Sequence, residues 1–184
     1  MSQVKRLGQP HARIDRGRPA TLGEYDLISG LTGLGTYHLH RSNQAELRDT
    51  LAYLVRLTEL ITIHAQPMPG WWTSGSPDRQ PSPRWPGGHG NLGLTHGITG
   101  GPLVLLATAL SHGHTVPGQT QAITGICDWL DHWRTGTGSR PWWPGLITPR
   151  RTPARQAPEP RTDTPVLVLR HPRHRRRLHC ALGA

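Results

Sequence analysis

Residues 91–101 read NLGLTHGITGG, and Pro102 and the apolar stretch LVLLATALS of residues 103–111 follow directly. Proline suits the first position of a helix, because the N–H that it lacks has no partner inside the helix there. Gly113 comes after the apolar stretch, where a glycine commonly ends a helix. The sequence therefore predicts a glycine-rich turn that leads into a buried helix.

A second stretch of the chain has the same character. Residues 26–35 read DLISGLTGLG, so Gly30 and Gly33 have the spacing of Gly97 and Gly100, and an apolar residue and a threonine stand between each pair. An apolar helix is predicted after each turn. A glycine-flanked helix entry that recurs in this way predicts a repeated helical hairpin array.

Two further helices are predicted from apolar periodicity. Asn43 and Glu46 have the spacing of a capping box, and the helix after them carries an apolar stripe made of Leu47, Leu51, Leu54, Val55 and Ile61. Pro117 opens the other helix, which Gly136 ends, and its buried stripe is made of Ile123, Ile126, Cys127 and Leu130. Cys127 is expected to be a packing residue.

These patterns divide the chain into three parts and predict an all-α fold. Residues 21–144 are expected to form the helical domain. Residues 1–20 are polar without a period and are expected to be disordered or poorly ordered, and residues 145–184 form a Pro/Arg-rich tail without helical periodicity.

The two turns and the segment ICDWLDHWRTGTGSRPWWP, residues 126–144, resemble conserved segments of the lanthionine synthetase C-like family, the class I lantibiotic cyclases, in the same order and at similar separation. The resemblance covers residues 21–144. It implies an α/α toroid, a double ring of helices. Family members are longer, so we expect this chain to be a fragment that supplies a partial toroid.

The resemblance also implies a chemistry. The family closes thioether rings by adding a cysteine thiol of a precursor peptide to dehydroalanine or dehydrobutyrine, on a zinc ion with three protein ligands and one open position. Asp26 matches the family aspartate, which would orient or assist proton movement. His96 matches the family histidine, which would be the acid/base or would hold the enolate oxygen. The implied partners are a lantibiotic-type precursor peptide and a dehydratase.

From the residues alone another interpretation stays open, in which Asp26 only caps the helix behind it and His96 is a satisfied turn residue. The chain also departs from the family pattern. It has no Trp-Cys-Tyr-Gly turn, its one His-Cys neighbour pair is His179-Cys180 in reverse order, and Gly101 adds one glycine before Pro102. We therefore expect no metal ligands and no cofactor in this chain, and little or no activity.

The tail suggests why the zinc turn is missing. Residues 166–175, VLVLRHPRHR, can be encoded so that the same bases, read one position later, give Ser-Trp-Cys-Tyr-Gly-Thr-Pro-Gly-Ile. We hypothesise a one-base frameshift between about Pro144 and Pro165. The arginine-rich run RHRRR of residues 173–177 would then be an accident of reading frame.

Composition leaves two other function classes to consider. A formal net charge of +10 and seven tryptophans would suit a small nucleic-acid-binding protein. However, no tryptophan follows Trp143, the densest basic run lies in the tail, and no nucleic-acid-binding signature is present, so we expect no nucleic-acid partner. A non-catalytic peptide-binding protein is the other alternative. Two cysteines and the absence of a long apolar run predict a cytoplasmic protein without a transmembrane segment.

Overall fold

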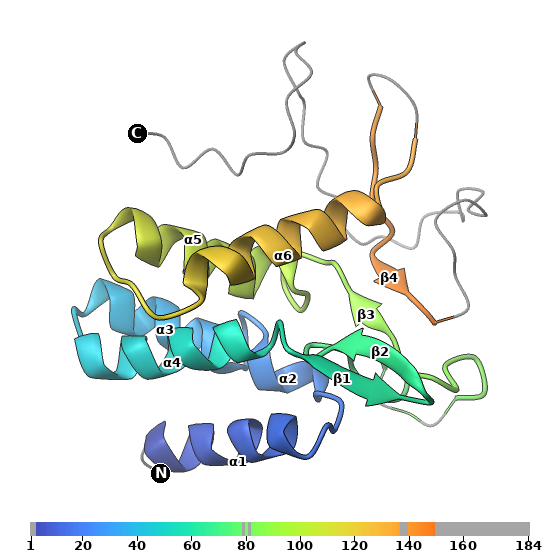
Figure 1. Ribbon diagram of the computed structural model, residues 1–184, viewed down its shortest axis with the longest axis horizontal. Coiled ribbons are helices and arrows are strands. Elements are labelled where there is room, and N and C mark those ends of the chain that lie inside the picture. The colour runs from blue at the N-terminus through green and yellow to red at the C-terminus, as the bar shows by residue number, and fades with distance from the viewer. Residues whose placement is uncertain (1–2, 79, 81, 137–139, 150–184) are drawn as a thin grey trace.

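A computed structural model describes residues 3–78, 80, 82–136 and 140–149. The helices lie in three layers (Figure 1): α5 and α6 on one side, α3 and α4 in the middle, and α1 on the other side. Two short pairs of strands lie together at one end of these layers. The described part of the chain is mostly helical, as the sequence predicts.

Among the described residues, six α-helices and one π-helical turn account for most of this architecture. They are α1 (Gln3–Asp15), α2 (Leu22–Tyr25), α3 (Leu31–His40), α4 (Gln44–Arg56), the π turn η1 (Thr99–Leu103), α5 (Val104–Ser111) and α6 (Gln119–His132). Helix α5 ends where predicted, since Gly113 adopts a left-handed φ of 80° directly after the C-cap residue His112.

The strands were not anticipated from the sequence. β1 (Leu60–Ile63) and β2 (Gln66–Pro69) form an antiparallel hairpin, and β3 (Gly90–Asn91) pairs with β4 (Leu146–Ile147). His64 and Ala65 connect β1 to β2 with φ values of 49° and 60°, the signs that a two-residue hairpin of type I′ requires. Ile61 therefore belongs to β1, and the predicted helix stops earlier, at Arg56.

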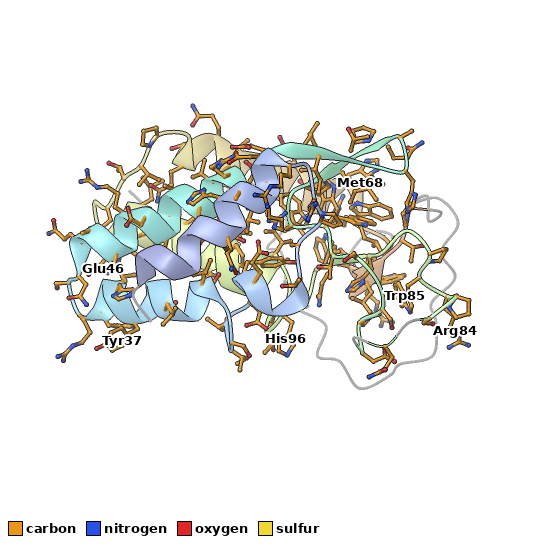
Figure 2. The ribbon with its side chains drawn as sticks, turned by 90° about the horizontal axis from the view of Figure 1, so that it is seen from below. Tyr37, Glu46, Met68, Arg84, Trp85 and His96 are labelled. Atoms are coloured by element: carbon orange, nitrogen blue, oxygen red, sulfur yellow. The ribbon has the colours of Figure 1, made fainter. Side chains whose placement is uncertain are left out.

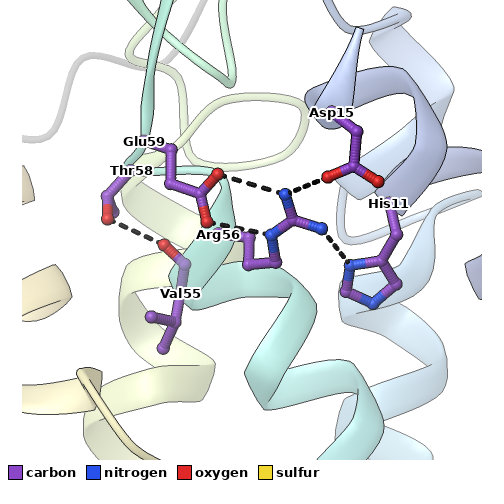
Figure 3. Close-up of polar contacts among 6 residues, drawn as sticks. All are labelled: His11, Asp15, Val55, Arg56, Thr58 and Glu59. Carbon is purple, nitrogen blue, oxygen red and sulfur yellow. Dashed lines mark hydrogen bonds and ion pairs between the residues drawn. The ribbon is translucent and has the colours of Figure 1, made fainter. Parts of the chain in front are cut away.

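Helix α1 occupies the segment for which the polar sequence gave no helical prediction. Its Ile14 is buried in the core, and Figure 3 shows how its C-terminal half is tied to α4 through the Arg56 guanidinium. Arg56 lies 2.6 Å from the Asp15 carboxylate, 3.1 Å from His11 Nδ1, and 2.9 Å from Glu59, three residues beyond the end of its own helix. Burial first, and the Arg56 charge second, lower the pKa of His11. These contacts are far apart in sequence, so periodicity within residues 1–20 cannot reveal them.

The main core lies between α3, α4, α5 and α6. The predicted stripe of α6 is buried at Ile123, Ile126 and Cys127, which is 8% exposed as a packing residue of the core, and Leu130 is partly buried. The stripe of α4 is also buried, through Leu47, Leu51 and Leu54. A second cluster of Trp72, Leu92, Trp133 and Ile147 attaches the β3–β4 pair to the end of α6.

The start of α4 differs in detail from the prediction. Asn43 is the N-cap residue, but its side chain makes no capping hydrogen bond. The amide Nδ2 instead lies 3.2 Å from His38 Nδ1 near the end of α3. Asn43 thus uses its side chain to hold the connection between two helices, so the expected capping box does not form through it.

No helix among the described residues has both the length and the apolar character needed to cross a membrane.

Candidate functional site

The first glycine-rich turn, between α2 and α3, folds around the Asp26 side chain. Asp26 is fully buried, and its Oδ1 accepts hydrogen bonds from the backbone N–H groups of Ser29 at 2.5 Å and Gly30 at 2.8 Å. Aspartate is well suited to this position because its short carboxylate reaches N–H groups three and four residues ahead. The turn therefore satisfies two donors at the entry of α3, since Gly30 itself has no side chain to cap the helix.

The second oxygen of the same carboxylate contacts His96. His96 Nδ1 lies 2.9 Å from Asp26 Oδ2, although the two residues are 70 positions apart. A carboxylate can only accept hydrogen bonds, so His96 donates from Nδ1, and its Nε2 is then available for another partner. The His96 side chain is 52% exposed whereas that of Asp26 is inaccessible. In Figure 2 the imidazole stands at the edge of the molecule, beside the α2–α3 region.

The two turns also meet through the backbone. The Leu27 N–H donates to the Thr95 carbonyl at 3.1 Å. Thus the residues directly after Asp26 and directly before His96 are hydrogen-bonded to each other. This contact and the Asp26–His96 bond fix the two turns in one relative position.

The four turn glycines stand where no side chain fits. A Cβ built on Gly30 would lie 2.4 Å from the Asp26 nitrogen, and one on Gly97 would lie 2.4 Å from the Gly93 nitrogen. On Gly33 it would meet the Leu27 carbonyl oxygen at 2.4 Å, and on Gly100 the Leu94 carbonyl oxygen at 1.9 Å. The clashes fall four and six residues back in both turns, so the two turns share one backbone course.

The family assignment follows from comparison of the sequence with known protein families. The model of the family described as Lanthionine synthetase C-like protein matches residues 5–157. This chain belongs to the lanthionine synthetase C-like family. The match extends past the 21–144 range of the resemblance at both ends, so it includes most of α1. No curated protein matches the sequence.

The zinc ion associated with the family finds no fitting site among the described residues. In that part of the chain no three His, Cys, Asp or Glu side chains are grouped closely enough to hold a metal ion. The Asp26 carboxylate is already bonded to three donors, and Cys127 is packed in the core on α6. His179 and Cys180 lie outside the described residues. We therefore derive no chemical step through zinc.

The sequence did not predict a largely buried polar cluster that connects the helix before the first turn to two other helices. Glu24 of α2 accepts hydrogen bonds from Arg13 of α1 at 2.8 Å and from the Tyr53 hydroxyl of α4 at 2.5 Å. Burial, followed by the Glu24 charge, raises the pKa of Tyr53 well above its ordinary value. No local pattern points to this cluster, because its members are 11 and 29 residues away from Glu24 along the chain.

Tyr25 anchors the same turn to the loop that follows β2. Its hydroxyl, fully buried, donates to the Trp71 carbonyl at 2.9 Å, and its own carbonyl accepts from Thr32 Oγ1 at 2.5 Å. Burial raises the pKa of Tyr25. Tyr25 before the turn and Thr32 after it thus make buried hydrogen bonds, which limit how far Asp26 can move.

Proposed function

We propose that the Asp26–His96 pair is the proton-transfer part of a thioether-forming peptide cyclase, and that this chain on its own does not close rings. The observation that carries this is the 2.9 Å bond from His96 Nδ1 to a fully buried carboxylate. Such an arrangement fixes the imidazole tautomer and its direction, which are the needs of a general acid or base.

Thioether formation requires only one proton transfer from these two residues. When a thiol adds to a dehydro residue, a carbon–sulfur bond forms, the carbon–carbon double bond becomes single, and the thiol proton ends on the α carbon. His96 Nε2 can accept or deliver that proton, because the ring is half exposed while Nδ1 is held by Asp26. No oxidation or reduction occurs.

Thiolate formation is the missing component. A thiol is a poor nucleophile until it loses its proton, and the described residues offer no three-ligand metal group to promote that loss. The partners of the complete reaction would be a dehydrated precursor peptide and the dehydratase that makes it. We place the reaction in the cytoplasm, where the two cysteines would stay reduced.

Two measurements on the full 184-residue chain test this proposal. Metal analysis after purification should find far less than stoichiometric zinc, and incubation with a dehydrated cysteine-containing peptide should give rings no faster than the peptide alone. Zinc at one equivalent, or efficient ring formation, would contradict it.

The proton-transfer role of His96 can be tested only in a chain that also activates a thiol. We propose the one-base frameshift as the origin of the missing zinc turn, and the family match, which ends at residue 157, stops short of residues 166–175. Genomic reads that show codons incompatible with the shifted frame would remove this idea. If the reads allow it, a frame-restored chain should gain zinc and cyclisation, and His96→Gln should then lower its kcat. An unchanged kcat would exclude His96.

A non-catalytic role in peptide binding is the second candidate. Leu27 and Ile28, directly after Asp26, are 37% and 66% exposed. Apolar side chains exposed beside the pair favour contact with apolar residues of a peptide. Calorimetry with a precursor peptide separates this role: binding weakened by Ile28→Ser, without ring formation, would support it.

A further inference from the structure

The helix that follows the second turn begins with a π turn. The Leu103 N–H donates to the Ile98 carbonyl at 3.1 Å, five residues back. In an α-helix the residue at position 102 would donate to that carbonyl, but Pro102 has no N–H. The π turn therefore satisfies a carbonyl that a regular α turn would leave without a donor.

Gly101 is the residue that the wider turn accommodates, and it lies at the contact between the two turns. It is buried. A Cβ on it would lie 3.3 Å from Thr32 Cγ2 and 3.5 Å from the Leu27 nitrogen. Leu27 is also the residue whose N–H bonds to Thr95. The extra glycine thus occupies the place where the second turn rests on the first.

The helix that follows the π turn, α5, is held in place by its packing in the core. Leu105, Leu106 and Ala109 of α5 are buried at 3% exposure or less, so α5 cannot rotate without exposing them. Each helical residue advances the chain by about 100° of rotation and about 1.5 Å of rise. With α5 held in place, one residue fewer would carry His96 away from a partner that is 2.9 Å distant.

We infer that the π turn is a positioning device, in which Gly101 and Pro102 set the register that brings His96 Nδ1 onto Asp26 Oδ2. Neither residue takes part in the hydrogen bond between His96 and Asp26, so both are positioning residues. We rest this on the proposed function only in taking the Asp26–His96 pair as the site. The test measures the hydrogen bond of His96 and not a reaction, so the positioning role and the proton-transfer role can fail independently.

The first test is deletion of Gly101, with Gly101→Ala as the control that keeps the residue count. Nitrogen-15 NMR of labelled histidine reports which ring nitrogen of His96 carries the proton, and His96→Gln assigns its signal. Wild type and Gly101→Ala should hold His96 as the Nδ1–H tautomer, and the deletion should lose that preference. A folded deletion variant that keeps the tautomer, or a folded Gly101→Ala variant that loses it, would overturn the inference.

A milder variant keeps the inference testable where the deletion does not fold. Pro102→Ala supplies the missing N–H, so a regular α turn can compete with the π turn. Couplings across hydrogen bonds show whether Ile98 accepts from residue 102 or from residue 103. The hydrogen bond from Leu103 to Ile98 and the Nδ1–H state of His96 should be kept together or lost together. If one is lost while the other remains, the π turn does not position His96.

Discussion

The two glycine-rich turns follow one backbone course but are closed by different chemical groups. In the first turn a side chain closes the loop, because Asp26 Oδ1 accepts from the N–H of Gly30 at 2.8 Å. In the second turn the backbone closes it, because the Gly93 carbonyl accepts from the N–H of Gly97 at 3.1 Å. The acceptor lies four residues before the glycine in both cases.

This difference divides the work between the turns. The first turn buries a carboxylate whose second oxygen remains available, and the second turn presents an imidazole at the surface. A side-chain acceptor can be altered without moving the backbone, whereas a backbone acceptor cannot. Loss of a side-chain acceptor should therefore affect the first turn more than the second, whereas a side chain added at a turn glycine should disturb either turn through steric clashes.

The largest effect is expected from Gly100→Ala. Its Cβ would lie 1.9 Å from the Leu94 carbonyl oxygen, which is backbone and cannot turn away. We expect a loss of about 3 kcal/mol or more in the free energy of unfolding, measured by urea denaturation followed through tryptophan fluorescence.

Gly125→Ala is the matched control for this substitution. Gly125 lies inside α6 with no atom within 4 Å of the Cβ position, so alanine should stabilise the helix by about 0.5–1 kcal/mol. If Gly100→Ala unfolds at the same urea concentration as wild type, the second turn does not have the described backbone course.

Asp26→Ala is the next largest. It removes the acceptor of three hydrogen bonds, from the Ser29 N–H, the Gly30 N–H and His96, and the one from Gly30 is buried. We expect a loss of about 2–3 kcal/mol in the free energy of unfolding. Asp26→Asn keeps one oxygen for the backbone but turns an NH₂ group toward His96, so about 1 kcal/mol should be lost. Asparagine should also move the His96 proton to Nε2, which histidine NMR detects. An Asn variant as unstable as the Ala variant would contradict the division of roles between the two oxygens.

The positions of the two turns were predictable from the sequence, because their signals are local. The spacing of Gly30 with Gly33 and of Gly97 with Gly100 indicated two similar turns, and the apolar stripe of α6 placed Cys127 in the core. The family resemblance singled out Asp26 and His96, and the structure brings their side chains together at 2.9 Å. Their catalytic role remains a prediction.

What the sequence did not reveal depends on contacts distant in the chain. Helix α1 is held by Arg56 of α4, and Glu24 is bonded to Tyr53; neither contact leaves a periodic pattern. The β1–β2 hairpin was missed because His64 and Ala65 are not the glycine or asparagine that usually indicate such a turn. Gly101 departs from the family pattern in the sequence, but the π turn around it depends on the hydrogen bond from Leu103 to Ile98, which no local pattern predicts. Residues 145–149 of the predicted tail are described and include β4, whereas residues 150–184, with most of the predicted frameshift window, lie outside the described part.

Acid should affect the second turn before the first. His89 is fully buried just ahead of β3, its Nδ1 donates to the Gly75 carbonyl at 3.1 Å, and its Nε2 has no hydrogen-bond partner within the described part of the chain. Burial lowers the pKa of His89, so the unfolded chain binds this proton more readily than the folded chain. Stability from neutral His89 is therefore complete above the ordinary histidine pKa of about 6.5 and is lost as pH falls below it.

The loss from His89 cannot exceed about 1.4 kcal/mol per pH unit, the limit for one proton. Hydrogen exchange between pH 7 and pH 5 should speed up first in residues 89–98 and later in residues 26–33. His89→Gln, which does not titrate, should reduce the acid sensitivity. His112→Gln, at the exposed end of α5, is the control. His11 contributes in the same direction, so part of the acid loss should remain. Equal acid sensitivity in wild type and His89→Gln would show that His89 is not the cause.

The smallest effect should come from Asn91→Ala, which removes the one side-chain acceptor described in the second turn. Asn91 Oδ1 accepts from the Gly93 N–H at 2.8 Å, two residues ahead, as Asp26 Oδ1 does for residues of the first turn. However, Asn91 is only half-buried, and the Gly93 carbonyl still closes the turn onto Gly97. We expect a loss of about 0.5–1 kcal/mol, with the His96 tautomer unchanged, because no part of its bond to Asp26 passes through Asn91. A loss as large as that of Asp26→Ala would mean that the second turn also depends on a side chain, and the contrast between the two turns would not hold.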